Sequence, residues 1–414
     1  MNEIETHESS DAKLSELQTG RRFSVKSHIL KRTLDLAMAI LPRWKEPNGN
    51  LVDQLWFCID PPAEKWSLYV LGPHEVSLMA QFPLVGQQSG LTSAAWIVNP
   101  MVLCELINNP SFRYNDALTF EFTGPALQIA SGDVAFKIPA GTAPSGPVGL
   151  FNINSEYEVG KACSAREIAE ALEFVLKFMD KSEASETSFL GSSSGLIYAG
   201  TSRMMSFCAC PNLSVELALG GRQSVLALKR ILHVLGEDLV QVSLIGNKTS
   251  LDCGFAKVLH SRPDEFSRRE GAVKRLRSFD PVYSVTMKRS QLRHSLDTVL
   301  RRSPNKDEFG RHSPTVTIRI PENGPKINIE LTPTLSRTVK LIGPDKPEVI
   351  SGWKTLGSRP HEIIVRLDDV LRAVKAIKGH DITIDCDKNN VVRLAPEPNE
   401  SFKTAVLVSS IRLQ

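Results

Sequence analysis

Helix-like patterning recurs three times along the chain. In each case apolar residues repeat at intervals of three and four positions, the spacing that places them on one face of an α-helix. The members are Ile29, Leu30, Leu34, Ala37, Met38 and Leu41; then Ile168, Leu172, Val175, Leu176 and Met179; then Leu292, Leu296, Val299 and Leu300. The pattern predicts three amphipathic helices, each of which opens a separate part of the chain.

A second unit also occurs three times: a short helix-like segment, a turn and an alternating strand that begins at an aspartate. The copies are Val102–Ile107 with Asp116–Phe122, Val225–Leu232 with Asp238–Leu244, and Val370–Ile377 with Asp381–Asp385. The aspartates lie 122 and 143 residues apart, which suits whole domains rather than solenoid units. Further alternating runs are predicted as strands at Thr315–Ile320, Lys326–Leu331 and Ala405–Val408. We therefore predict α+β domains of one type, each with two helices on an antiparallel sheet.

Two segments predict the boundaries between these domains. Ile138–Pro147 is rich in turn formers, and Arg262–Arg277 is a charged run with little apolar periodicity. With an acidic, polar N-terminal stretch, the prediction is a disordered tail at 1–20 and domains at 21–148, 149–280 and 281–414. No stretch approaches 18 uninterrupted apolar residues, so we expect a cytoplasmic protein without a signal peptide or membrane span.

Composition narrows the function classes. Of the 414 residues, 42% are hydrophobic and 23% charged, as in an ordinary globular protein. The net charge of only +3 excludes a histone-like cationic surface, but the charge is unevenly distributed. Residues 1–150 carry 11 basic and 15 acidic residues, 151–275 carry 15 and 15, and 276–414 carry 23 and 16. Attraction to nucleic acid would therefore depend on local arrangement.

Catalytic and metal-binding motifs are weak. The seven cysteines include no CxxC pair, which argues against zinc and against a disulfide framework. Gly191–Gly195 matches GxSxG around Ser193, but the expected strand before it and helix after it are missing, so we interpret it as a turn. Gly160-Lys161-Ala162 lacks two residues of a phosphate-binding loop. We predict no catalytic residues, no metal and no cofactor.

From about residue 21 to the C-terminus, the order and spacing of these features resemble the bacterial DNA polymerase III beta subunit, the sliding clamp. The residues that carry the resemblance are Asp133–Ala140, Phe309-Gly310-Arg311, His361–Val365 and the C-terminal Ala405–Gln414. The resemblance implies three tandem clamp domains and a head-to-tail homodimeric ring. Such a ring encircles double-stranded DNA and tethers a polymerase as a non-catalytic processivity factor.

The resemblance also implies basic helices that attract phosphate without reading sequence. Helix cations outnumber acids in most of the segments, apart from Arg166–Lys181 and Val102–Ile107. The predicted DNA-binding residues are Lys31, Arg32, Arg43, Trp44, Lys45, Arg222, Lys229, Arg230, Arg289, Arg293, Arg372 and Lys375. Two plainer interpretations stay open: the cations solvate outward helix faces, and Trp44 packs on its own domain.

A peptide-binding groove between the second and third domains is the family's partner site, through which polymerases, the clamp loader and repair proteins bind. Its predicted residues here are Met204, Met205, Pro263, Ser409, Ser410, Ile411, Arg412 and Leu413. Gly200–Met205 departs from the family's signature, so we expect an altered peptide preference. The alternative is that both methionines are core residues.

Three further hypotheses arise where the sequence departs from the sliding-clamp family or contains a motif of another protein class. Arg301-Arg302 replaces an apolar pair at the family's subunit interface, so either acidic residues of the first domain meet it or ring closure differs. A clamp-fold scaffold, such as a mobile-element or specialised copy that binds peptides without encircling DNA, is the main alternative function. A serine hydrolase using Ser193 is the third.

Overall fold

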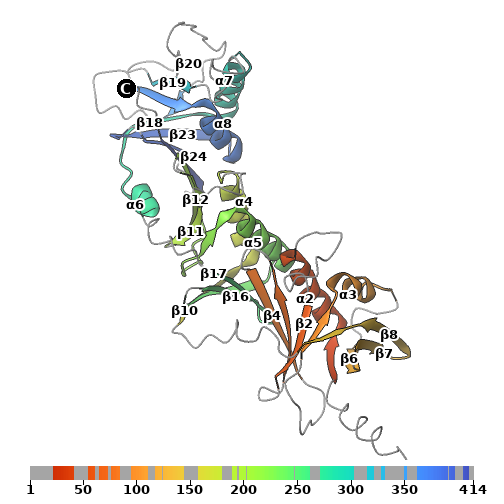
Figure 1. Ribbon diagram of the computed structural model, residues 1–414. Helices are drawn as coiled ribbons and strands as arrows, with labels where there is room; N and C mark the ends of the chain where they lie inside the picture. Colours follow the sequence, from red (N-terminus) through yellow and green to blue (C-terminus); the bar gives the residue numbers. More distant parts are fainter. Residues whose placement is uncertain are drawn as a thin grey trace, which may run out of the picture. The chain divides into compact units, whose positions relative to one another are not determined.

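The computed structural model contains one order of elements three times: strand, helix, four strands, helix, three strands. It describes residues 22–41, 55–60, 65–72, 76–83, 95–110, 117–123, 125–143, 157–179, 189–193, 195–201, 203–246, 248–261, 271–302, 315–320, 328–331, 349–351, 361–389, 391–396 and 404–409. Figure 1 shows the labelled elements along the chain.

The first repeat comprises β1 (Arg22–Lys26), α2 (Ser27–Ile40), β2 (Leu55–Asp60), β3 (Lys65–Leu71), β4 (Val76–Pro83), β5 (Ala95–Val98), α3 (Pro100–Ile107), β6 (Ala117–Thr123), β7 (Ala126–Ser131) and β8 (Val134–Pro139), followed by β9 (Gly141–Ala143). The second comprises β10 (Tyr157–Ser164), α4 (Ala165–Leu176), β11 (Phe189–Ser193), β12 (Leu196–Gly200), β13 (Met204–Ala209), β14 (Ala218–Gly220), α5 (Gly221–Leu235), β15 (Leu239–Ile245), β16 (Lys248–Asp252) and β17 (Ala256–Ser261), followed by α6 (Gly271–Arg277). The third comprises β18 (Pro281–Lys288), α7 (Arg289–Arg302), β19 (Thr315–Ile320), β20 (Asn328–Leu331), β21 (Val349–Ser351), β22 (His361–Arg366), α8 (Leu367–Ala376), β23 (Asp381–Asp387), β24 (Val391–Pro396) and β25 (Thr404–Ser409).

Strand pairing repeats with the element order. The first strand of each repeat pairs with the strand after the second helix, which produces the orders β1-β6-β7-β8, β10-β15-β16-β17 and β18-β23-β24-β25. Most of the other strands form β4-β3-β2-β5, β13-β12-β11-β14 and β20-β19-β22, whereas β9 pairs with β5 and β21 pairs with β18. Every described pairing is antiparallel. The prediction of two helices with antiparallel strands in each repeat is confirmed.

Two strand pairs join one repeat to the next. β17 pairs with β4, with Val258 opposite Leu78, and β25 pairs with β13, with Val406 opposite Ser206. These joints extend the sheets to nine strands each. By contacts the chain divides into two compact units, Met1–Arg166 with Leu226–Arg262, and Glu167–Val225 with Pro263–Gln414. Each unit contains one nine-stranded sheet, so the units do not coincide with the repeats.

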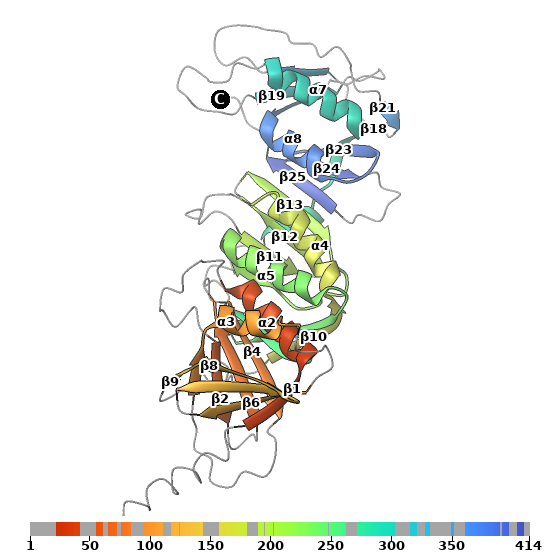
Figure 2. The same ribbon diagram turned by 90° about the vertical axis from the view of Figure 1, so that its right-hand side faces the viewer.

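The helices form where the apolar periodicity predicts them. On α2 the buried face includes Leu30, Leu34 and Ala37, each at most 2% exposed, because positions three and four apart lie on one side of a helix. α3 begins at Pro100, where the Asn99 side chain accepts hydrogen bonds from the backbone N–H groups of Met101 and Val102. Figure 2 shows α2 and α3 side by side in the first unit.

Stacked aromatic rings fill the core of the first unit. The Phe23 ring lies 5.0 Å from Trp66 and 4.6 Å from Phe120, measured between centroids. Trp96 and Phe122 continue the stack at 4.6 Å. β1, β3, β5 and β6 each contribute to this cluster, so the aromatic residues hold the two sheets of the first repeat together.

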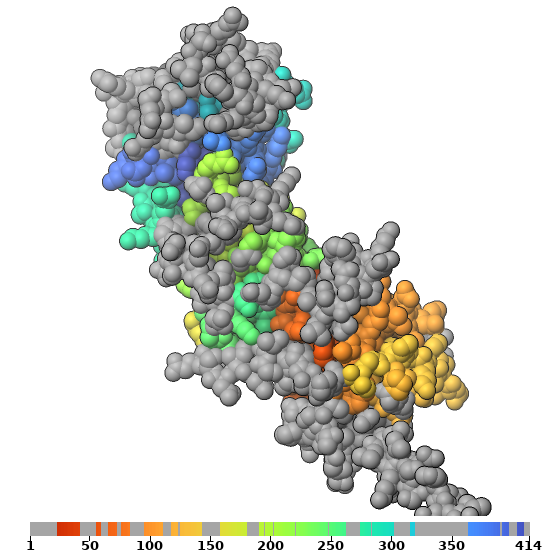
Figure 3. All heavy atoms as spheres, in the orientation of Figure 1, coloured from red at the N-terminus to blue at the C-terminus, as the bar shows by residue number. Residues whose placement is uncertain are grey.

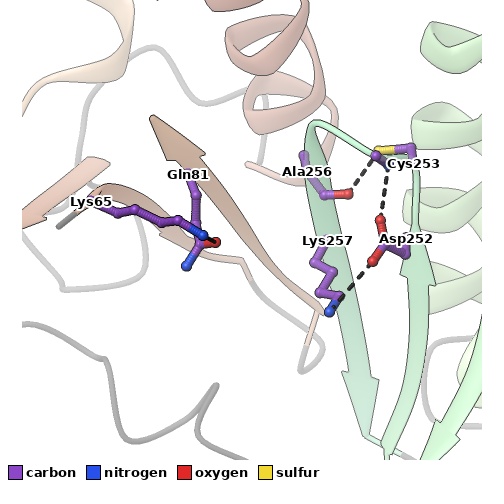
Figure 4. Close-up of polar contacts among 7 residues, drawn as sticks. Lys65, Gln81, Asp252, Cys253, Ala256 and Lys257 are labelled. Atoms are coloured by element: carbon purple, nitrogen blue, oxygen red, sulfur yellow. Dashed lines mark hydrogen bonds and ion pairs between the residues drawn. The ribbon is translucent and has the colours of Figure 1, made fainter. Parts of the chain in front are cut away.

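The β16–β17 hairpin is closed by local polar contacts (Figure 4). The Cys253 thiol donates to the Ala256 carbonyl at 2.9 Å, and the Asp252 carboxylate contacts the Lys257 ammonium at 3.4 Å. The Gly254 N–H donates to the same carboxylate, and Gly254 has a φ of 83°, a conformation that glycine adopts without strain. On the adjoining strands β3 and β4, Lys65 contacts Gln81 at 3.5 Å.

Several boundaries differ from the sequence-based predictions. The helix predicted at Arg166–Lys181 ends at Leu176, whereas α5 extends over Gly221–Leu235, beyond the predicted Val225–Leu232. The predicted linker Ile138–Pro147 begins within β8 and contains β9, and the predicted linker Arg262–Arg277 contains α6. Turn-forming residues occur at edge strands as well as in linkers, which explains the first of these errors. The tail 1–20 lies outside the described residues, and the three domain boundaries stay predictions.

Candidate nucleic-acid interface

The helix pair of the third repeat carries a concentration of exposed cations. Leu292, Leu296 and Val299 of α7 are buried, and so are Val370, Leu371 and Val374 of α8, which leaves the polar positions of both helices at the surface. The exposed cations on and beside these helices are Lys288, Arg293, Arg301, Arg372, Lys375 and Lys378.

Asp297 is the acidic group that joins the two helices. Its carboxylate lies 3.5 Å from Arg293 on the same helix and 3.0 Å from Lys375 on α8. One carboxylate therefore contacts two cations, and the surroundings keep a net positive charge. Such exposed ion pairs contribute little to stability, so both cations remain able to exchange this carboxylate for a phosphate.

Asp368 and Asp369 lie in the first turn of α8, where negative charge is favourable. Burial raises the pKa of Asp369 above its ordinary value, and the nearby guanidinium groups of Arg203, Arg372 and Arg366 oppose that rise. The acidic pair is therefore explained by its place at the start of α8.

Two of the predicted DNA-binding arginines are engaged at helix ends of their own chain. Arg289 donates to the Ile377 carbonyl at 2.6 Å, just beyond α8. Arg222 donates to the Leu176 carbonyl at 2.6 Å and to the Met179 carbonyl at 3.3 Å, at the end of α4. Terminal helix carbonyls lack partners within the helix and carry partial negative charge. These side chains therefore have a structural role, which the sequence pattern did not reveal.

The second repeat has a balanced charge on its helices. Lys229 and Arg230 of α5 are half-buried and in contact with other groups. The exposed row on and just beyond α4 contains both signs, with Glu170 and Glu173 between Arg166 and Lys177. Arg166 forms an ion pair with Glu237 at 2.6 Å. This helix pair therefore resembles a solvated surface more than a phosphate-binding one.

In the first repeat Lys31 is exposed, but Arg32 contacts the Asp238 carboxylate and its guanidinium lies 4.7 Å from the centre of the Phe255 ring. Arg32 thus connects α2 to the loop before β15 and to the β16–β17 turn. The exposed positions of α3 are the apolar Met101 and Val102 together with Glu105. Arg43, Trp44 and Lys45, the other predicted DNA contacts, lie outside the described residues.

The structure brings together the described members of the predicted peptide groove. Met204 and Met205 begin β13, and β25 pairs beside them with Val408 opposite Met204. The Ser409 N–H donates to the Arg203 carbonyl at 3.0 Å. Successive strand residues point to opposite faces, so the two methionines do not share a surface. Met204 is 3% exposed, and Met205 packs with a cluster of Tyr198, Phe207, Phe279 and Leu407. Pro263, Ser410, Ile411, Arg412 and Leu413 lie outside the described residues.

The GxSxG match occupies a hairpin. β11 ends at Ser193, Gly195 has a φ of 75°, and β12 begins at Leu196. The Ser192 hydroxyl is buried, donates to the Val215 carbonyl at 3.0 Å and accepts from the Leu217 N–H at 2.7 Å. A nucleophile elbow requires a helix after the serine, so this strand-turn-strand geometry confirms the interpretation as a turn.

All seven cysteines are free thiols. Burial raises the pKa of Cys58 and Cys386 to about 12, and that of Cys104, Cys208 and Cys253 to about 11. A raised thiol pKa means less thiolate at neutral pH, and the thiolate is the nucleophile. Within the described ranges no three His, Cys, Asp or Glu residues gather as metal ligands. No described helix has the length and apolar character that crossing a membrane requires.

We predict slow alkylation of these five thiols. At pH 8, three pH units below a pKa of about 11, only about one thiol in 1,000 is ionised. Iodoacetamide labelling of the native protein, followed by mass spectrometry, should be about 100-fold slower than labelling of the protein in urea. Any of the five that reacts as fast when native as when unfolded would contradict the assignment of inert, buried thiols.

The triple repeat, its two strand joints and its paired helices define the class of fold, that of a bacterial DNA polymerase sliding clamp. Solved structures with this fold include the sliding clamp of Pseudomonas aeruginosa, at 13% identity and a TM-score of 0.61, with 95% of this chain and 99% of that chain covered. The DNA polymerase III beta subunit of Thermotoga maritima matches at 17% identity and 0.60, with 95% and 100% covered. The sliding clamp of Caulobacter crescentus matches at 12% and 0.62, also with 95% and 100% covered.

At these identities the likeness shows the fold, and it does so over nearly the whole chain. No protein-family profile matches the sequence, and no curated protein sequence matches it. The similarity of this chain to the sliding clamps is therefore one of fold and not of sequence. This is expected for a divergent sequence that retains the repeated strand order.

Proposed function

We propose that this chain is a DNA sliding clamp that encircles double-stranded DNA and tethers a polymerase in the cytoplasm, as a non-catalytic processivity factor. The observation that carries the proposal is the cationic surface of α7 and α8 on a sliding-clamp fold. Contacts of lysine and arginine with phosphate are independent of sequence, and a clamp that slides needs attraction without base readout.

The unequal charge of the three helix pairs refines the proposal. On and beside the helices of the third repeat six cations are exposed, and the Asp297 carboxylate contacts two of them, whereas α4 exposes acids as well as cations and α3 has no basic residue. We propose that phosphate contacts come mainly from the third repeat of each subunit. A homodimer would then hold the duplex at two such surfaces rather than evenly around the hole.

Strand pairing supports closure into a ring. β17 and β25 are the last strands of their four-stranded groups, and each pairs with the fourth strand of the preceding repeat. The equivalent strand β8 lies at the edge of its sheet among the described residues. We infer that a second copy of the third repeat supplies the missing neighbour head to tail.

We predict that Ala135→Pro disrupts dimerisation without unfolding the chain. Ala140 donates to the Pro125 carbonyl at 2.8 Å, so alternate residues of β8 bond to β7, and the Ala135 N–H points to the free edge. Proline removes that donor and is tolerated at edges. Scattering with size exclusion should change from a mass near twice 45.7 kDa to one near 45.7 kDa, with circular dichroism unchanged. A dimer of unchanged mass would exclude this edge.

Partner proteins, namely the polymerase, the clamp loader and repair proteins, would bind by short peptides at the groove of Met204 and Ser409. Arg203, whose carbonyl bonds to Ser409, adds a cation that the sequence-based set did not include. The altered residues favour partners with a different peptide motif and so a specialised copy of the clamp.

The second candidate is a clamp-fold scaffold that binds peptides without encircling DNA. It is favoured by the exposed Met101 and Val102 of α3 and by the engagement of Arg32 with Asp238. Retention on circular plasmid, and release after the plasmid is cut once, would support the clamp. Equal behaviour on circular and linear DNA would support the scaffold.

A further inference from the structure

A short basic helix packs on the sheet of the second unit. α6 and the residue Phe279 just beyond it are anchored by Leu276 and Phe279, which pack with Tyr198 of β12, Phe207 of β13 and Leu407 of β25. Tyr198 and Ile197 point to opposite faces of β12. Figure 1 shows α6 across β11 and β12 from α4, and its teal segment is at the surface in Figure 3.

Three cations occupy the outward positions of α6. Lys274, Arg275 and Arg277 are exposed, whereas Leu276 between them is partly buried. Within the part of the chain that the structure describes, none of the three side chains has a hydrogen-bond or ion-pair partner. The described surface therefore presents three unpaired positive charges within four residues.

The support beneath these cations is rigid. Phe279 is 8% exposed, and the Arg393 guanidinium lies 4.6 Å from the centre of its ring. Arg393 is itself held by two contacts with the Asp385 carboxylate, at 2.9 and 2.8 Å. A surface that is already ordered loses little conformational entropy on binding.

A role in stabilising α6 does not by itself explain why the helix has three exposed cations. Cations in the last turn favour a helix through its dipole, but that effect does not require all three cations. In addition, Ser278 already satisfies the carbonyls of Lys274 and Arg275 at the end of the helix. Solvation of an ordinary surface usually includes acids as well, as on α4, where Glu170 and Glu173 lie between Arg166 and Lys177.

The size of the patch favours a protein segment over duplex DNA. Three cations on one helical turn provide few of the roughly 6–10 phosphate contacts of a typical DNA-binding surface. Lys274 and Arg277 are three residues apart, and side chains at that spacing on a helix lie about 5–6 Å from each other. This distance is close to the spacing of about 6.6 Å between alternate residues of an extended peptide. Met205, a residue of the predicted peptide groove, packs with the same hydrophobic cluster that anchors α6. A peptide bound at the groove would therefore lie close to α6.

We propose that the outward face of α6 binds an extended acidic segment of a partner protein, with alternate aspartate or glutamate side chains on Lys274 and Arg277, which lie three residues apart, and a further carboxylate on Arg275 at the flank of the helix. The interaction surface is separate from the α7–α8 surface, and it functions whether or not the chain encircles DNA.

The test uses the full-length protein and a fluorescent peptide of six glutamates, with a peptide of six glutamines as the neutral probe. Anisotropy at low salt should show binding of the acidic peptide only. The variant Lys274→Gln/Arg275→Gln/Arg277→Gln should bind it about tenfold more weakly, since three exposed charge contacts are lost. The charge-retaining variant Lys274→Arg/Arg275→Lys/Arg277→Lys should bind it as the unchanged protein does.

A matched control removes the same charge elsewhere. Lys65→Gln/Lys161→Gln/Lys248→Gln, on the sheet of the first unit, should change the affinity by less than about twofold, because none of these lysines belongs to the α6 surface. An equal loss in this control would overturn the proposal, as would full binding by the α6 glutamine variant. Tighter binding of a 20-base-pair duplex than of the acidic peptide, lost in the same variant, would overturn it in favour of phosphate recognition.

Discussion

Substituting glutamine for Arg293, Arg372 and Lys375 is expected to weaken binding to duplex DNA by roughly 10²–10³-fold at 0.1 M salt, because each lost phosphate contact forfeits about 0.9 of a counterion. All three side chains are exposed on α7 and α8, and the ion pairs of Arg293 and Lys375 with Asp297 are partly exposed, so they contribute little to stability. The plot of log affinity against log salt should lose about 2.7 of its slope, as three contacts imply.

Arg289 is not part of this variant because it bonds the Ile377 carbonyl, and its loss would also disturb α8. The measurement is a salt series of DNA binding, with scattering to show that the dimer mass is retained. The α6 glutamine variant removes three charges from a different surface and is the control: its DNA affinity should be nearly unchanged. An unchanged salt slope in the α7–α8 variant would refute the DNA-facing assignment, and equal slope losses in both variants would indicate a general charge effect.

Phe23→Ala is expected to lower the free energy of unfolding of the first unit by about 3–5 kcal/mol, the usual cost of removing a buried phenyl ring. Phe23 is 0% exposed and lies between Phe57, Trp66, Phe82 and Phe120, with centroid distances of 4.6–5.9 Å. The cavity left behind would lie where both sheets of the first repeat meet, so the surrounding rings have little room to close it.

Urea unfolding followed by tryptophan fluorescence measures this loss, because Trp66 belongs to the same cluster. Two compact units need not unfold together, so the first-unit transition should shift to lower urea while a transition of the second unit stays in place. Met101→Ala is the control: Met101 is 46% exposed, and the change should be within about 0.5 kcal/mol. A similar small loss for Phe23→Ala would contradict the aromatic core.

Local sequence was sufficient for the repeated elements of the fold. The three- and four-residue spacing of Leu30 and Leu34, or of Leu292 and Leu296, predicts helices because a helix has one apolar side, and those residues are buried. The alternating runs after Asp116, Asp238 and Asp381 correspond to β6, β15 and β23. Because the same order of elements recurs at the spacing of whole domains, the prediction of three similar domains was stronger than any single segment would allow.

Part of the candidate site followed from the same local patterns. Arg293, Arg372 and Lys375 were recognised as helix cations, and their exposure agrees with that interpretation. Met204 and Ser409 were expected to be neighbours from the family resemblance and not from a local pattern. Met204 pairs with Val408, next to Ser409, and the role of these residues in peptide binding stays a prediction. Composition also predicted the excess of positive charge in the last third of the chain, because charge counts do not depend on folding.

Tertiary structure alone decided how individual side chains are used. Arg32, Arg222 and Arg289 look equivalent to Arg293 in sequence, yet they contact Asp238 or helix-end carbonyls far along the chain. The role of α6 depends on a cluster from β12, β13 and β25 that no local window contains. The joints of β17 with β4 and of β25 with β13 are likewise long-range. A local pattern determines which face of an element is apolar. The partner of a charge or of a strand edge depends on contacts between segments that lie far apart in the sequence, 46, 88 and 206 residues for Arg222, Arg289 and Arg32.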